Sequence, residues 1–405
     1  MKPQQNSLIS KEEALHRIFS IWSPIPETEE IPLQEAEGRV LAQTLSARYN
    51  LPVVRASAMD GAAIRYADVK DGLPEASFWK PGETYVRADT GDDFPDAYDT
   101  VIAIEQAAVQ PDGSIVFAEG LEIKEGMNVN PSGSQLRQGD TVGLQGTILT
   151  ALDLAAAGMG GYSTVPVYRK PRVAFVPTGS ELIPIGSIPE RGQNFDTNSL
   201  MASRMIREMG GEPVLRTITR DDPVQVQAVL SSLLEEADIV ILNAGTSKGR
   251  EDYCGQLLDQ SGALFHGVAA VPGRPMSAAV ISGKPVLNIS GPALAAFYSM
   301  EWMVKSLVCR YYGIPVPQRP TAQVTLTDTL HCPPPMSLLC MLSVSTGADG
   351  SLQAKPLSMR GPHSVRSGAL LTANAMYMTT PGEPVHQAGE TITVQLLRPL
   401  TQKIF

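Results

Sequence analysis

One segment, from Ala237 to Tyr253, limits the folds open to this chain more than any other. Residues Ile239–Asn243 are apolar until the last position, which predicts a buried strand. A loop of small residues, Ala244–Ser247, follows directly, and Glu251–Asp252 stand where a helix would start. This order of strand, small loop and helix forms anion sites in α/β proteins, because free backbone N–H groups and the helix dipole point to one place.

Two carboxylates in this segment, Glu251 and Asp252, are out of place beside a bare anion, because like charges repel. They fit a site in which a divalent cation lies between them and a phosphate. The segment therefore predicts a metal-assisted site for a phosphorylated ligand. Capping of the following helix is the alternative explanation for both carboxylates.

The segment belongs to a longer pattern in which strands and helices alternate over residues 170–313. It includes a strand over 172–176, a helix from about Asn198 to a pair of glycines, and a helix capped by Asp222. An apolar helix over 293–313 ends the pattern. The alternation predicts a doubly wound, mainly parallel sheet, in which ligands bind beyond the carboxyl ends of the strands. The loops at that edge are 177–181, 244–252 and 290–292.

The rest of the chain predicts further domains around this α/β block. Ser10–Glu13 has a capping-box pattern before a helix, and helical spacing continues over 33–45 and in a Gly-rich stretch over 151–162. Short β runs such as 100–104 and 114–117 predict a small inserted β domain, and the C-terminal part predicts a small barrel or sandwich. The predicted domains are 1–50 with 140–169, 51–139, 170–314 and 315–405.

Composition and charge exclude several classes of protein. The 405 residues carry a net charge of −10, which argues against a nucleic acid held by a broad basic surface. The polar N-terminus lacks a signal peptide's apolar core, and no apolar run reaches the roughly 18 residues of a membrane span, so we expect a cytoplasmic protein without a membrane partner. Four scattered cysteines fit buried thiols in a reducing cytosol. Five scattered histidines give no indication of a zinc site.

Other turns carry further candidate site residues: Asp60 in 56–61, Thr90 in 89–92 and Glu181 in 177–182. Taken singly, the first two are ordinary turns, whereas Glu181 follows a buried strand at the ligand-binding edge of the sheet. Arg274 offers a guanidinium for an anion, with a plain surface loop as the alternative. The chain has neither a Walker motif nor a GxGxxG loop after a strand, which argues against a dinucleotide enzyme.

Taken in order, the motifs of this chain resemble those of the MoeA family, the molybdopterin molybdenumtransferases that include the gephyrin E domain. They are SAMDG at 57–61, TGSEL at 178–182 with DTNSLM at 196–201, ADIVILNAGTSKGREDY at 237–253, PGRP at 272–275, and TANAMYMTTPG at 372–382 with AGETITVQLL at 388–397. The resemblance covers essentially the whole chain. It implies a multidomain α/β fold with an elongated helical domain, an inserted β domain, a three-layer α/β molybdopterin-binding domain and a C-terminal barrel-like β domain.

The resemblance also implies an activity. This family inserts molybdate into adenylylated molybdopterin, with Mg2+-dependent hydrolysis of the phosphoanhydride and release of AMP. It further implies a homodimer whose active site lies in a cleft shared between subunits. Other cofactor-biosynthesis proteins and molybdoenzyme chaperones are additional candidate partners. The chemistry agrees with the metal-assisted phosphate site predicted from the residues themselves.

Individual residues of the site are implied by their positions in these motifs. Asp60, Glu181 and Asp252 match the acidic active-site positions of the family, as both catalytic and metal-binding residues. The residues matched to binding of the molybdopterin substrate are Thr90, Thr178, Gly179, Gly245, Thr246, Ser247, Gly249, Arg274, Ser290 and Gly291.

Some motifs depart from the family pattern and leave more than one function open. The family's GGVSVGDxDY loop is AGTSKGREDY at 244–253, its LPGNP turn is ISGPA at 289–293, and its NVRxxGED segment is NVNPSGSQ at 128–135. An active insertase is the first hypothesis, and a non-catalytic carrier or scaffold that binds molybdopterin is the second. An insertase for another oxyanion, such as tungstate, lies between them. A nucleotide-linked oxidoreductase would need a fingerprint that is absent.

Overall fold

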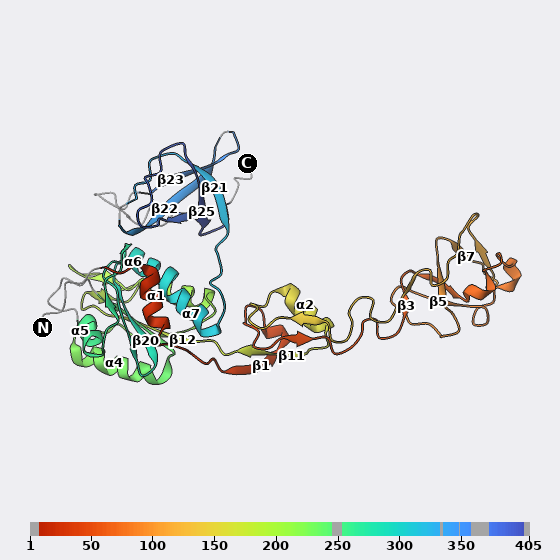
Figure 1. Cartoon of the computed structure of the whole chain (residues 1–405), viewed down its shortest axis with the longest axis horizontal. Coiled ribbons are helices and arrows are strands. Elements are labelled where there is room, and N and C mark those ends of the chain that lie inside the picture. Colours follow the sequence, from red (N-terminus) through yellow and green to blue (C-terminus); the bar gives the residue numbers. More distant parts are fainter. Residues whose placement is uncertain (1–7, 245–252, 333–334, 348, 358–371, 401–405) are drawn as a thin grey trace. The chain divides into compact units, whose positions relative to one another are not determined.

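The computed structural model describes residues 8–244, 253–332, 335–347, 349–357 and 372–400. The chain divides into two compact units, one of Thr28–Tyr168 and the other of Met1–Glu27 with Arg169–Phe405. Figure 1 draws the elements of both. Among the described residues, no helix combines the length and the apolar character that crossing a bilayer would require.

A six-stranded sheet forms the centre of the α/β part of the second unit. Its strands, in spatial order, are β15 (Glu212–Leu215), β12 (Arg172–Pro177), β16 (Ile239–Ala244), β20 (Lys284–Ser290), β19 (Ser277–Ile281) and β17 (Phe265–His266). The first four strands run parallel, and β19 and β17 each pair antiparallel to the strand before them in this order. The predicted mainly parallel sheet is therefore confirmed.

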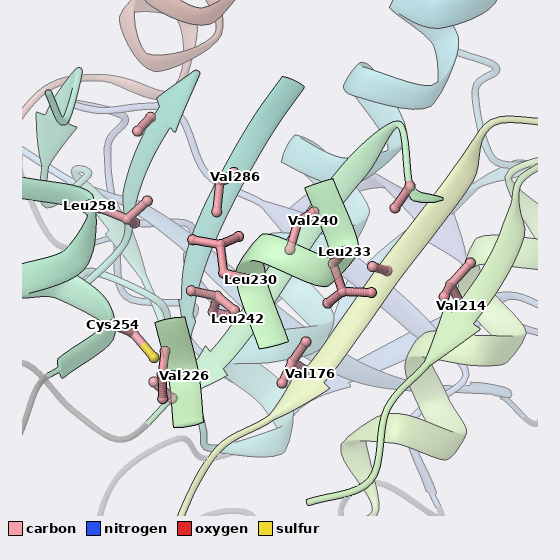
Figure 2. Packing of buried hydrophobic residues seen from close by; sticks show 14 residues of the cluster. Val176, Val214, Val226, Leu230, Leu233, Val240, Leu242, Cys254, Leu258 and Val286 are labelled. Carbon is pink, nitrogen blue, oxygen red and sulfur yellow. The ribbon is translucent and has the colours of Figure 1, made fainter. Parts of the chain in front are cut away.

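One face of this sheet packs against α4 (Pro223–Glu236) and α5 (Tyr253–Gln260). Figure 2 shows this core, in which Leu230 and Leu233 of α4 meet Val240 and Leu242 of β16. Because side chains alternate along a strand, the neighbouring residues of β16 face the other side of the sheet. There α3 (Asn198–Glu208) lies against β12 and β15.

The apolar helix predicted over 293–313 is present as α6 (Ala293–Ser299), the π-helical turn η4 (Met300–Val304) and α7 (Lys305–Tyr312). Glu301 of η4 is buried, yet it accepts two hydrogen bonds from the Arg319 guanidinium, at 2.8 and 2.7 Å. Lys305 lies 3.6 Å from the same carboxylate. A buried carboxylate needs such partners, and this pairing joins the helix to the segment that leads into the C-terminal domain.

Helix α1 (Lys11–Phe19) begins as predicted, since Ser10 Oγ accepts a hydrogen bond from the Glu13 backbone N–H at 3.1 Å. Arg17 then donates to the Leu264 carbonyl at 3.0 Å, and Ile9 pairs with Val268. These contacts place the first residues in one unit with the α/β part, whereas the sequence predicted a domain of 1–50 with 140–169.

The C-terminal part is a small barrel. Its strands are β21 (Thr321–Leu326), β22 (Ser337–Thr346), β23 (Leu352–Pro356), β24 (Ala375–Met378) and β25 (Thr391–Leu396), and β18 (Ala270–Val271) adds to β22. Pairing of β22 with both β23 and β24 closes the ring, which removes open sheet edges. Of the two architectures left open by the sequence, the barrel is the one observed.

The other unit, Thr28–Tyr168, is built mainly from short antiparallel pairs. They are β1 (Thr28–Pro32) with β11 (Thr164–Tyr168), β2 (Leu45–Ser46) with β10 (Thr141–Gly143), β3 (Ala56–Ser57) with β9 (Val129–Asn130), β7 (Ala107–Val109) with β8 (Ile115–Phe117), and the sheet of β5 (Tyr85–Ala88), β4 (Gly61–Ile64) and β6 (Thr100–Ala103). Its helices are α2 (Ala151–Met159), η1 (Leu33–Glu35), η2 (Tyr66–Asp68) and η3 (Ala76–Phe78). The β runs predicted near 100 and 115 and the helix near 151 are confirmed.

The helix predicted over 33–45 is wrong. Only η1 (Leu33–Glu35) is helical there. Gly38 adopts a φ of +72°, which ends the helical conformation, and the residues after it form isolated β-bridges. Val40 pairs with Ile148, and Leu41 pairs with Val167. The apolar residues that suggested one helical face instead fill a core between short strands, with Leu41 and Leu45 fully buried.

Candidate functional site

A cavity of about 470 Å³ lies at the carboxyl edge of the α/β sheet. Thr178 follows β12, Asn243 lies near the end of β16 and Gly291 follows β20, and all three line the cavity. In doubly wound sheets this edge is where ligands bind. The volume falls in the range of small-molecule sites, roughly 300–1,000 Å³. The fold therefore brings three of the predicted residues, Thr178, Glu181 and Gly291, to one cavity.

Two buried asparagines hold the floor of this cavity together. Asn243 has the opposite orientation to Leu242, so its side chain faces α3, where Asn198 starts the helix. Asn198 Nδ2 donates to Asn243 Oδ1 at 2.9 Å and to the Gly291 carbonyl at 2.6 Å. Asn243 Nδ2 in turn donates to the Ser290 carbonyl at 2.9 Å. The two amides thus connect α3, β16 and the loop after β20.

Glu181 lies on the wall of the cavity, and its carboxylate lies beside Gly179. A Cβ atom at position 179 would lie 2.7 Å from Glu181 Oε2, and Gly179 has a φ of +155°. The φ of +155° favours glycine at this position, whereas the exposed Glu181 side chain could move away from a Cβ atom. The missing side chain leaves room for the Glu181 carboxylate to lie over the loop backbone.

A two-stranded ladder positions the same wall. The strands β13 (Leu182–Ile183) and β14 (Asn194–Phe195) run parallel, and the Asn194 N–H donates to the Glu181 carbonyl at 2.9 Å. Asp196 follows β14, and its Oδ1 accepts from the Ser199 N–H at 3.1 Å, within the first turn of α3. Two carboxylates, Glu181 and Asp196, therefore line one cavity together with the start of a helix.

Asp60 and Thr90 lie together in the other unit, Thr28–Tyr168. Asp60 Oδ1 accepts from the Thr90 backbone N–H at 2.6 Å and from the Thr90 hydroxyl at 2.7 Å. These two bonds lower the pKa of the Asp60 carboxyl, and the Arg87 guanidinium lowers it further. The carboxylate is exposed, ionised and held in a fixed orientation, which suits a cation ligand.

The remaining predicted residues lie elsewhere or outside the described residues. Ser290 is buried, and its hydroxyl donates to the Pro275 carbonyl at 3.1 Å, so its side chain is directed at the neighbouring loop. Arg274 is exposed in the turn after β18 and does not line the cavity. The predicted residues outside the described part are Gly245, Thr246, Ser247, Gly249 and Asp252.

Sequence reasoning missed Asn198, Asn243 and Asp196 as site residues. Asn243 carried a usable signal, since it is the one polar residue in an otherwise apolar strand, at the end where ligands bind. Asn198 and Asp196 were taken only as the start of a helix. The role of Asn198 depends on its hydrogen bond to Asn243, at the end of β16, which sequence spacing does not reveal.

Fold and cavity together define the class of protein: a multidomain α/β protein with a ligand site at the carboxyl edge of a mainly parallel sheet. Residues 9–161 match a family model for the MoeA N-terminal region (domain I and II), and residues 174–309 match one for a probable molybdopterin binding domain. Together the two matches cover most of the chain.

Relatives and solved structures agree with these matches. A molybdopterin molybdenumtransferase of Haemophilus influenzae is 26% identical over 92% of this chain and 95% of its own length, and one of Bacillus subtilis is 26% identical over 98% and 95%. A crystal structure of a molybdopterin biosynthesis MoeA protein from Pyrococcus horikoshii superposes with a TM-score of 0.77 at 25% identity, covering 96% of this chain and 100% of that one. The chain belongs to the MoeA family, and like these relatives it is a transferase.

The asparagine pair leads to a stability prediction. Replacing Asn198 by Asp keeps the shape but removes both donated hydrogen bonds and brings a carboxylate against two carbonyl-type oxygens. We expect the free energy of unfolding, measured by urea denaturation, to fall by about 1–3 kcal/mol or more. The control is Asn194→Asp, an exposed position in the same cavity wall. Equal, small effects of both substitutions would contradict the role given to Asn198.

Proposed function

We propose that this chain is a molybdopterin molybdenumtransferase of molybdenum cofactor biosynthesis. In this proposal it inserts molybdate into adenylylated molybdopterin, while the phosphoanhydride is hydrolysed and AMP is released in a Mg2+-dependent reaction. The observation that carries the proposal is the cavity of about 470 Å³, because it lies within the segment that matches a molybdopterin-binding family model.

The cavity supplies groups suited to a pterin with a phosphate. Amide groups in a cavity wall can bind a heterocycle through lone pairs that internal hydrogen bonds leave free, because an amide oxygen can accept two hydrogen bonds. Asn243 and Asn198 are such groups, and the N-terminus of α3 at Thr197 offers a favourable place for negative charge. We assign the pterin and its phosphate to this cavity, with Thr178 and Gly291 as further contacts.

The predicted acidic residues fit a divalent cation such as Mg2+, because carboxylate oxygens are the ligands that this ion prefers. We propose Asp60, Glu181 and Asp252, each by its own carboxylate, as ligands of such a cation. When bound, the cation would neutralise negative charge on the phosphates that are cleaved. The contribution of Thr90 is to hold the Asp60 carboxylate ionised and oriented. Arg274 is proposed to attract the oxyanion substrate, molybdate.

We also propose a cytoplasmic homodimer. All four cysteines are free and buried, which suits a reducing compartment. Leu152 and Met159 lie two turns apart on one side of α2 and are 82% and 49% exposed. An apolar helix face of this kind fits contact with a second copy. Sedimentation of the purified chain as a monomer at micromolar concentration would exclude the homodimer.

The activity is tested by incubating the purified chain with adenylylated molybdopterin, molybdate and Mg2+, and in parallel with tungstate. We expect release of AMP and formation of the molybdenum cofactor. Tight binding of molybdopterin without turnover, beside an active control insertase, would overturn the catalytic proposal and favour a carrier. Turnover with tungstate alone would overturn molybdate as the substrate.

Replacing Glu181 by Gln tests the cavity carboxylate. The substitution keeps the size and removes the charge, so we expect AMP release to fall by roughly 100-fold, as when a charge-stabilising group is lost. The unfolding curve should stay unchanged because the side chain is exposed. Glu190→Gln, at an exposed position in the following loop, is the matched control and should keep full turnover. Unchanged turnover of Glu181→Gln would contradict its role.

Two substitutions separate the charge of Asp60 from its orientation. Asp60→Asn should reduce AMP release by roughly 10- to 100-fold, whereas Thr90→Val should have a smaller effect, because the Thr90 backbone N–H still donates at 2.6 Å. Raising the Mg2+ concentration should partly restore the Thr90 variant. Asp93→Asn, an exposed position three residues beyond Thr90, serves as the control. A larger loss in Thr90→Val than in Asp60→Asn would contradict the assignment.

A further inference from the structure

A second group of reactive side chains lies in the C-terminal barrel, away from the residues that line the cavity. Cys332, Glu383 and His386 each offer one potential ligand atom, and these atoms lie within 4.8 Å of one another. Among the described residues, these three form the group of Cys, His and carboxylate side chains that could hold a metal ion. Its members are buried or nearly so: Cys332 is 6% exposed, and the side chains of Glu383 and His386 are 11% and 18% exposed.

The backbone fixes the two halves of this cluster against each other. Leu330 and His386 form an antiparallel bridge, with N–H to carbonyl distances of 2.9 and 3.1 Å. Cys332 lies two residues beyond Leu330, so this bridge brings the segment of Cys332 close to that of His386. The thiol and the imidazole therefore lie close together because the backbone brings their two segments together.

Neighbouring groups orient the imidazole and the carboxylate. His386 Nδ1 lies 3.2 Å from Glu390 Oε2, which leaves Nε2 directed at the cluster, 2.6 Å from Glu383 Oε1. The hydroxyl of Tyr377 donates to Glu383, and the Thr380 N–H donates to Glu383 Oε2 at 2.6 Å. A histidine whose second nitrogen is held by a carboxylate is the usual arrangement of metal-binding histidines.

We propose that Cys332, Glu383 and His386 form a binding site for a zinc-class divalent cation. A thiolate with an imidazole selects such ions over Mg2+, which prefers oxygen ligands alone. The ion would take the place of the hydrogen between His386 Nε2 and Glu383 Oε1 and move these two atoms to about 3.3 Å apart. Water completes a tetrahedral site at the fourth position.

An ion at this site would link two loops of the barrel. Cys332 follows β21, while Glu383 and His386 lie in the connection between β24 and β25, so one ion would fasten two separate loops. Neither the proposed insertase activity nor its Mg2+ involves these residues. The metal site and the insertase activity are therefore tested by independent experiments.

The test is titration of the reduced, metal-free full-length chain with Co2+, an optical substitute for Zn2+, followed by displacement with Zn2+. We expect one ion per chain, a cobalt–thiolate charge-transfer absorption, and a rise in melting temperature with Zn2+. Cys332→Ser should abolish the absorption, and His386→Gln should abolish or strongly weaken binding. Glu390→Gln, which alters only the partner of the imidazole, should keep the absorption but weaken affinity about 10- to 100-fold.

Cys340→Ser is the matched control, because Cys340 is a buried thiol of the same barrel that lies outside the cluster. It should keep the full cobalt signal. Absence of a thiolate signal in the unsubstituted chain, or its retention in Cys332→Ser, would overturn the proposal and leave a purely hydrogen-bonded cluster. If Cys332→Ser fails to fold, the unchanged chain and the Glu390→Gln variant still decide the outcome.

Discussion

The burial of the parallel strands on both faces is the constraint on which the α/β part depends. Strands β12, β16 and β20 are covered by helices on each side, so nearly all their residues must be apolar. Most polar side chains of these strands lie at or near the strand ends. Asn243 lies at that point and remains buried because Asn198 and the Ser290 carbonyl satisfy its amide. The packing that makes the sheet stable therefore also determines where a ligand can bind.

Asp60 and Glu181 each lie in their own unit, in surroundings formed by nearby residues. Asp60 is held by the backbone and hydroxyl of Thr90, and the Glu181 carboxylate lies beside Gly179, where a Cβ atom would contact it. Neither arrangement requires the other unit to be present. The Asp60 carboxylate is thus oriented before a substrate or cation binds, which lowers the cost of ordering it on binding.

The sequence allowed prediction of the α/β architecture, because strong apolar periodicity and helix caps such as Ser10 and Asp222 are local signals. It failed over 33–45, where apolar spacing looked helical but long-range pairing of Val40 and Leu41 decided the structure. The carboxylates Asp60 and Glu181 were chosen as candidates through motifs. Asn198 and the Cys332 cluster were not, because they depend on contacts between residues far apart in the sequence, and spacing carries no record of such contacts.

The central claim is that molybdopterin binds in the cavity at the carboxyl ends of β12, β16 and β20. A crystal structure of the chain with adenylylated molybdopterin tests it most directly. The account predicts ligand density against Thr178, Asn243 and Gly291, with the phosphates toward Glu181 and the start of α3. Full occupancy of the ligand elsewhere on the chain, with this cavity holding only water, would contradict it.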